Sequence, residues 1–292
     1  MKSGFVAIIG RPNVGKSTLL NAILGEKVAI VSDKPQTTRN HIRGIFTDSD
    51  YQIIFIDTPG IHKPKNKLGS YMLEAAETSL NEVELVLFLV DDSLSVGPGD
   101  RYIIELLANV KTPKFLLINK TDKMTPDGFK SVFDFYSKET AFQEVFGISA
   151  ISGDNVPRLM EAIKAQMKEG PQYFPNDIVT DHPERFIITE IIREKLLHYL
   201  ENEVPHGVAV EIENYSEEKA VTKIGAVIYC EKKSHKGIII GKDGKKLKGI
   251  GKSARLDIEA LLGIKVYLEL WVKVKENWRE SDFMLNSLGY KK

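Results

Sequence analysis

The stretch GRPNVGKS, residues 10 to 17, constrains the fold of this chain more than any other feature. It matches the phosphate-binding pattern G-x-x-x-x-G-K-[ST], follows the apolar run FVAII and precedes the helical pattern KSTLLNAIL. In this order, backbone N–H groups at a helix N-terminus can converge on phosphate oxygens. The alternative is an ordinary glycine turn before a helix. The order of elements favours a nucleoside triphosphate site.

Short apolar runs alternate with helical patterns from residue 5 to about residue 167. The runs FVAII, YQIIFID, ELVLFLVD, PKFLLIN and VFGIS have no polar alternation, which is typical of strands buried on both faces. We therefore predict an α/β domain over residues 1–168, with a mostly parallel sheet and helices on both faces. Ligands of such a sheet bind at the carboxyl ends of its strands.

A second, smaller domain is expected after a proline-containing segment. Residues 169–184 show no helical or strand period and are predicted to be a linker. Residues 185–292 then give the order helix, strand, strand, helix, helix, strand, which predicts an α+β domain.

Positive charge is concentrated in this second domain. The whole chain has 40 Lys and Arg against 40 Asp and Glu, yet nine basic residues face a single acid, Asp243, between Lys232 and Arg255. This run predicts contact with a polyanion. Cys230 is the only cysteine, which excludes an internal disulfide and fits a reducing compartment. The N-terminal apolar run is too short for a signal peptide, so we expect a cytoplasmic protein.

Two motifs predict how phosphate and metal are bound. In the first loop, Lys16 would neutralise β- and γ-phosphate oxygens, and the Ser17 hydroxyl would bind Mg²⁺. DTPG, residues 57 to 60, is a common turn by itself, but here it follows the strand run YQIIFI. Asp57 could hold Mg²⁺ through water, and the Gly60 N–H could meet the γ-phosphate.

Two more motifs predict which base is bound. In NKTD, residues 119 to 122, Asp122 can accept from guanine N1–H and the exocyclic amine, while Asn119 bonds the other edge of the purine. Adenine would leave the Asp122 acceptor unsatisfied. SAIS, residues 149 to 152, can aim a backbone N–H at guanine O6. Together these motifs predict GTP rather than ATP.

The four motifs, in this order and spacing, resemble those of a translation-factor-class GTPase. That resemblance implies that KPQTTRN, residues 34 to 40, is switch I, with Thr38 closing over Mg²⁺ in the GTP state. The alternative is that Thr37 and Thr38 cap a turn. Ile61 occupies the position where Ras-like enzymes have a water-orienting glutamine, so catalysis would rest on Mg²⁺, Lys16 and loop amides, with slow turnover.

Asn13 resembles the asparagine of GTPases that bind K⁺ beside the bridging phosphate oxygen. There the cation could replace an arginine finger. The alternative, that Asn13 only stabilises the loop, stays open.

A second glycine and lysine stretch lies at GKDG, residues 241 to 244. It lacks the glycine spacing and the Gly-Lys-Ser ending of a phosphate-binding loop. It matches instead the I-I-G-x-x-G loop of K-homology domains, and the order of elements resembles their type II variant. In that design the loop and an adjoining groove bind single-stranded nucleic acid. The alternative is a solvated basic helix with glycine turns.

The whole chain resembles the Era family of bacterial GTPases, through GRPNVGKSTLLN, KPQTTRN, DTPGIHKP, NKTD, IIGKDG and LELWVKVK. The resemblance implies a GTP- and GDP-binding switch that binds the single-stranded 3′ end of 16S ribosomal RNA and assists assembly of the 30S ribosomal subunit, with a link to growth or cell-cycle control. A monomer is expected, and peripheral contact with the inner face of the cell membrane is compatible with this interpretation. Two other classes are considered: a metabolic kinase and a membrane-surface scaffold.

The predicted residues fall into four sets. The catalytic set is Lys16, Thr38 and Gly60, with Asn13 as a K⁺ ligand, and the metal set is Ser17, Thr38 and Asp57. The nucleotide-binding set is Gly10, Arg11, Pro12, Asn13, Val14, Gly15, Lys16, Ser17, Thr18, Asp57, Thr58, Pro59, Gly60, Asn119, Lys120, Asp122, Ser149, Ala150 and Ile151. The RNA-binding set is Lys236, Ile240, Gly241, Lys242, Asp243, Gly244, Lys245, Lys246 and Lys248.

Overall fold

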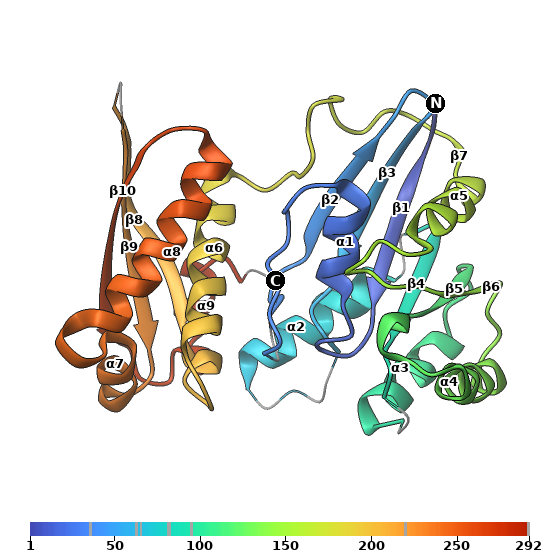
Figure 1. The fold of residues 1–292 in the computed structure, drawn as a ribbon, viewed down its shortest axis with the longest axis horizontal. Helices are drawn as coiled ribbons and strands as arrows, with labels where there is room; N and C mark the ends of the chain where they lie inside the picture. Colours follow the sequence, from blue (N-terminus) through green and yellow to red (C-terminus); the bar gives the residue numbers. More distant parts are fainter. Residues whose placement is uncertain are drawn as a thin grey trace. The chain divides into compact units, whose positions relative to one another are not determined.

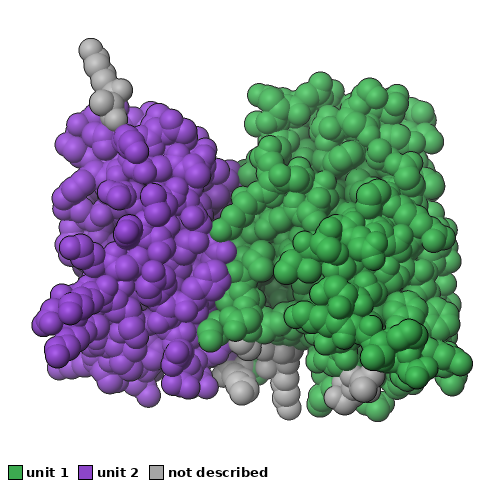
Figure 2. Space-filling model, viewed as in Figure 1, with its two compact units in different colours: residues 1–65, 69–181 green, residues 66–68, 182–292 purple. Residues whose placement is uncertain are grey.

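A computed structural model of the chain describes residues 1–34, 37–61, 64, 66–80, 83–93, 96–218 and 221–290. Pro35 and Gln36 of the predicted switch I, and His62 and Lys63 after DTPG, lie outside the described residues. The chain forms two compact units, which Figure 2 colours separately. Unit 1 comprises residues 1–65 and 69–181, and unit 2 comprises residues 66–68 and 182–292.

Unit 1 is built on the predicted, mostly parallel sheet, with strand order β2-β3-β1-β4-β5-β6. The strands are β1 (Lys2–Ile9), β2 (Ile42–Thr47), β3 (Tyr51–Asp57), β4 (Leu85–Val90), β5 (Lys114–Ile118) and β6 (Glu144–Gly147). Only β2 in this order pairs antiparallel to its neighbour. Val6 to Ile9 of the central strand β1 are fully buried, because helices cover both faces of the sheet.

The helices of unit 1 are α1 (Lys16–Leu24), α2 (Lys67–Thr78, which belongs to unit 1 from Gly69 onward), α3 (Pro98–Ala108), α4 (Pro126–Glu139) and α5 (Val156–Gln166), with the 3-10 turn η1 (Thr121–Lys123). Helices α2, α3 and α4 share one apolar cluster with β1, β4 and β5. Helices α1 and α5 contact each other and lie in front of the sheet in Figure 1. The fold class is therefore the predicted one.

The segment predicted as a linker differs most from expectation. Its first residues form β7 (Lys168–Glu169), which pairs antiparallel with β1. The Gln52 side chain then accepts hydrogen bonds from the N–H groups of Tyr173 (2.7 Å) and Phe174 (2.9 Å) and donates to the Phe174 carbonyl (2.8 Å). Unit 1 therefore extends to residue 181. Side-chain bonding to an aperiodic backbone leaves no hydrophobic period, so no pattern in the sequence indicates that these residues pack with unit 1.

Unit 2 contains the predicted order of elements around a three-stranded sheet. Its elements are α6 (Glu184–Tyr199), η2 (Pro205–Gly207), β8 (Ala209–Glu217), β9 (Thr222–Cys230), α7 (Lys233–Ile240), η3 (Lys242–Gly244), α8 (Lys245–Leu262), β10 (Val266–Val274), η4 (Trp278–Glu280) and α9 (Asp282–Ser287). Strand β9 lies between β8, to which it is antiparallel, and β10, to which it is parallel. The last turn η4 and α9 were not predicted. Trp278 of η4 is fully buried and donates to the Gly207 carbonyl at 2.9 Å.

The Gln52 contacts generate a prediction about residues 171–181. Gln52→Met keeps the side-chain volume but removes the hydrogen-bond partner of the part-buried Tyr173 and Phe174 N–H groups, at about 0.5–1.5 kcal/mol for each bond lost. We expect faster amide hydrogen exchange at Tyr173 and Phe174 and a lower free energy of unfolding. Gln172→Met is the matched control, because exposed Gln172 also donates to the Phe174 carbonyl. Unchanged exchange at both amides would contradict the account.

Candidate nucleotide and nucleic-acid sites

The phosphate-binding loop follows β1 and opens α1, as the sequence predicted. Gly15 has φ 104°, and a side chain there would meet the Asn119 amide nitrogen at 2.2 Å, so only glycine fits. The Lys16 ammonium donates to the carbonyls of Gly10 (3.1 Å) and Arg11 (2.9 Å). Burial lowers the pKa of Lys16 to about 8, although Asp57 partly opposes this effect. The loop thus holds a buried cation close to several backbone N–H groups.

The three predicted metal ligands meet at one point. The Asp57 carboxylate accepts from the Ser17 hydroxyl at 2.7 Å and from the Thr38 hydroxyl at 3.2 Å, and the two hydroxyl oxygens lie 3.0 Å apart. Burial raises the pKa of Asp57, although Lys16 and both hydroxyls oppose that shift. Its other oxygen is buried and has no hydrogen-bond partner among the described residues. Two hydroxyls and a carboxylate are hard oxygen donors, which suit Mg²⁺.

The NKTD and SAIS motifs lie together at the ends of β5 and β6. Asn119 donates to the Val14 carbonyl at 2.8 Å and accepts from the Ala150 N–H at 2.9 Å, so it joins the first loop to SAIS. Asp122 accepts from the Ser149 hydroxyl at 2.7 Å. The Asp122 carboxylate therefore faces the pocket from a held position, with capacity left for further donors. This arrangement suits the paired N–H donors of guanine.

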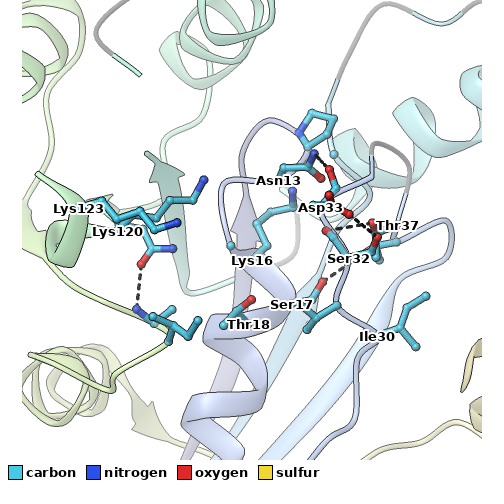
Figure 3. Close-up of a pocket in the computed structure, with 18 of the residues that line it drawn as sticks. Asn13, Lys16, Ser17, Thr18, Ile30, Ser32, Asp33, Thr37, Lys120 and Lys123 are labelled. Atoms are coloured by element: carbon cyan, nitrogen blue, oxygen red, sulfur yellow. Dashed lines mark hydrogen bonds between the residues drawn. The ribbon is translucent and has the colours of Figure 1, made fainter. Parts of the chain in front are cut away.

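These groups enclose a pocket of about 370 Å³ (Figure 3). It is lined by Pro12, Asn13, Gly15, Lys16, Ser17, Thr18, Ile30, Val31, Ser32, Asp33, Thr37, Thr38, Gly60, Asn119, Lys120, Asp122, Lys123, Ala150 and Ile151. The sequence did not identify residues 30–33, Thr37 or Lys123 as part of the site. Residues 30–33 carry no motif, and only their position before switch I could have indicated them.

Some predicted nucleotide residues do not line the pocket. Gly10, Val14, Asp57, Thr58, Pro59 and Ser149 are buried just outside the lining. Arg11 also does not line the pocket, and its guanidinium pairs with Asp91 (3.1 Å) and Asp100 (2.7 Å). The Asn13 amide nitrogen donates to the Asp33 carbonyl at 2.5 Å, as Figure 3 shows.

The second glycine loop joins α7 to α8 in unit 2. Gly241 and Gly244 have φ 73° and 72°, and a side chain on Gly241 would meet the Lys246 Cβ at 2.7 Å. Asp243 between them also has a positive φ, 51°. The glycines thus allow a sharp turn at the N-terminus of the basic helix α8, where backbone N–H groups are available to an anion.

A groove of about 500 Å³ lies beside this loop, between α8 and β10. It is lined by Gly244, Leu247, Lys248, Gly251, Lys252, Arg255, Leu268 and Leu270. The leucines can contact bases, and the cations can contact phosphates. Gly251 lies beside Leu270 in this groove, at a spacing where a Cβ would make ordinary van der Waals contact (3.4 Å).

Only Gly244 and Lys248 of the predicted RNA-binding set line this groove. The other seven residues belong to α7, the loop or the first turn of α8, and Ile240 packs against the core. Lys252 and Arg255 were missed, although they follow Lys248 at helical spacing and share its face. Leu268 and Leu270 could have been found only by placing β10 beside α8.

Comparison with known proteins finds a GTPase domain and a KH domain in this chain. Residues 5–120 match the family model described as 50S ribosome-binding GTPase, and residues 203–279 match the KH domain model. The chain is 60% identical to the GTPase Era of Alkaliphilus oremlandii over 291 residues, covering 99% of each chain. It is 58% identical to the GTPase Era of Clostridioides difficile over 292 residues, covering 99% of this chain and 98% of that one.

Two solved structures are similar over the full length of both chains. One is a variant of Aquifex aeolicus Era bound to GDP·AlF4⁻, with a TM-score of 0.95 and 40% identity. The other is Era in complex with MgGDPNP and nucleotides 1506–1542 of 16S ribosomal RNA, with the same score and identity.

The base-reading geometry predicts a change of specificity. Asp122→Asn replaces an acceptor facing guanine N1–H with an amide, so we expect GTP affinity to fall at least about tenfold for the lost charged hydrogen bond. Xanthosine triphosphate, which carries an acceptor where guanine has its amine, should gain affinity. Competition binding with both nucleotides measures the change, and an unaltered preference for GTP would refute the role of Asp122.

Proposed function

The chain belongs to the Era family of GTPases, and from this premise we propose that it is a GTP-controlled switch that binds the 3′ region of 16S ribosomal RNA and assists assembly of the 30S subunit. GTP hydrolysis is the activity of this family. The observation that supports the RNA function is the α8–β10 groove, which combines three cations with three leucines beside a glycine loop. Such a combination suits single-stranded RNA, whose bases are unstacked and whose backbone is charged.

In the proposed GTP complex, Ser17 and Thr38 would hold Mg²⁺ directly and Asp57 through water, and the ion would neutralise phosphate charge. Lys16 and the loop amides bind the phosphates and stabilise negative charge as the terminal bond breaks. Ile61 is 1% exposed and packs in the core, so its side chain cannot orient water. The attacking water must be positioned by backbone groups or by a partner, which predicts slow intrinsic turnover.

The switch would lie in the contacts of Thr38 and Gly60. The Thr38 hydroxyl lies 3.0 Å from the Ser17 hydroxyl of the phosphate-binding loop and donates to the Asp57 carboxylate at the end of β3. Gly60 lies against the same loop, because a side chain there would meet the Pro12 nitrogen at 2.7 Å. GTP would order both segments, and RNA affinity would respond to their state.

The glycine loop of unit 2 predicts a separation of activities. Gly241→Asp combined with Gly244→Asp adds side chains and negative charge where phosphate would lie, so RNA affinity should fall about tenfold or more. GTP hydrolysis should be unchanged. Gly263→Asp is the control, because Gly263 ends α8 with a similar φ of 67° and open space around it. Loss of both activities in the double variant would mean that the two sites do not lie in independent units.

We also propose that K⁺ assists hydrolysis through the Asn13 oxygen. Single-turnover hydrolysis should then be faster in K⁺ than in Na⁺, and Asn13→Ala should abolish the difference. Equal rates in the two salts would remove the K⁺ role and leave Asn13 with its bond to the Asp33 carbonyl.

The other classes are less well supported. Full-length similarity to GTPases speaks against a metabolic kinase. Among the described residues, no helix is long and apolar enough to cross a membrane. Peripheral contact with the membrane, cytoplasmic location, the monomeric state and a link to growth control stay predictions from the sequence.

A further inference from the structure

Asp91 lies directly after β4 and joins two loops of the nucleotide site. Its carboxylate accepts from the Arg11 guanidinium at 3.1 Å and from the Lys120 ammonium at 3.0 Å. Arg11 belongs to the phosphate-binding loop and Lys120 to NKTD. The two cations come from segments more than a hundred residues apart and share one anion.

The Asp91 carboxylate is charged and firmly held. Burial alone would raise its pKa, but the Ser93 side chain and the Lys120 ammonium hold the pKa of Asp91 below its usual value. Arg11 extends the network to Asp100 of α3, whose carboxylate is 1% exposed and accepts from the Gly97 N–H at 3.0 Å. Helix α3, the phosphate-binding loop and NKTD are therefore connected through charges that water screens only weakly.

Lys120 has an unusual backbone conformation. Its φ is 66°, a left-handed value that costs a residue with a side chain roughly 1–2 kcal/mol. Such a conformation persists where surrounding contacts hold it. Lys120 lies between Asn119, which is bonded to the first loop and to SAIS, and Asp122, which lines the pocket. The bond from Lys120 to Asp91 therefore helps to fix the direction of both side chains.

We propose that Asp91 is a positioning residue that sets the phosphate-binding loop and the base-reading motif at the spacing that guanine nucleotides require. Asp91 does not line the pocket. It acts through Arg11 on the loop that binds phosphate and through Lys120 on the motif that binds guanine. The inference concerns the GTP site alone and stands whether or not the chain binds RNA.

The test compares Asp91→Asn with Asp92→Asn, an identical change at the exposed neighbouring residue. Dissociation of fluorescent mant-GDP, measured by stopped flow, should be about tenfold faster in Asp91→Asn, as expected for loss of one charged contact. It should change less than about twofold in Asp92→Asn, which removes only a solvated charge.

A double-mutant cycle separates positioning from general destabilisation. If Asp91 acts through Lys120, adding Asp91→Asn to Lys120→Met should accelerate release much less than in the wild-type background. Two results would overturn the proposal. One is a wild-type rate of mant-GDP release from Asp91→Asn, and the other is effects of the two substitutions on that rate that multiply. Should Asp91→Asn fail to fold, Arg11→Met and Lys120→Met form the cycle instead. If their effects on the release rate do not multiply, the two residues are connected through Asp91. If the effects multiply, the proposal is contradicted.

Discussion

The arrangement of the nucleotide site in the GTPase unit depends on the hydrogen bonds that the Asp57 carboxylate accepts. This carboxylate draws the Ser17 and Thr38 hydroxyls onto one oxygen, at 2.7 Å and 3.2 Å, and leaves its other oxygen buried without a partner among the described residues. An unpaired buried carboxylate oxygen is costly unless a cation or water satisfies it. The same contact therefore explains why a metal would bind there and how the predicted switch segment would respond to the bound nucleotide.

The two glycine loops are suited to phosphate groups of different ligands. The first follows a buried strand and surrounds Lys16, which is 5% exposed, so it can enclose a triphosphate. The second turns sharply between two helices and opens onto a groove lined by Lys248, Lys252 and Arg255. Exposed lysines and arginines attract an extended polyanion at a surface, whereas one buried lysine binds a compact one. Their context, more than their glycine content, distinguishes the two sites.

Motifs and apolar runs predicted the fold class, because buried parallel strands and the loop after β1 have local sequence signals. The residues around Asp57, Asn119 and Asp122 were predicted because their chemistry is tied to short motifs. The Gln52 contacts were not predicted, because the Gln52 side chain bonds backbone groups of a segment whose sequence has no hydrophobic period. Leu268 and Leu270 were not predicted for a similar reason. The groove forms where α8 packs beside β10, and no local sequence pattern indicates that contact.

In the proposed function, one chain couples a GTP site to an RNA site. The most direct test measures the affinity of the protein for a single-stranded RNA matching the 3′ end of 16S ribosomal RNA, at one salt concentration, with either a non-hydrolysable GTP analogue or GDP bound. The account predicts affinities that differ at least about fivefold, the lower end of typical coupling energies. Equal affinities in the two states would contradict it.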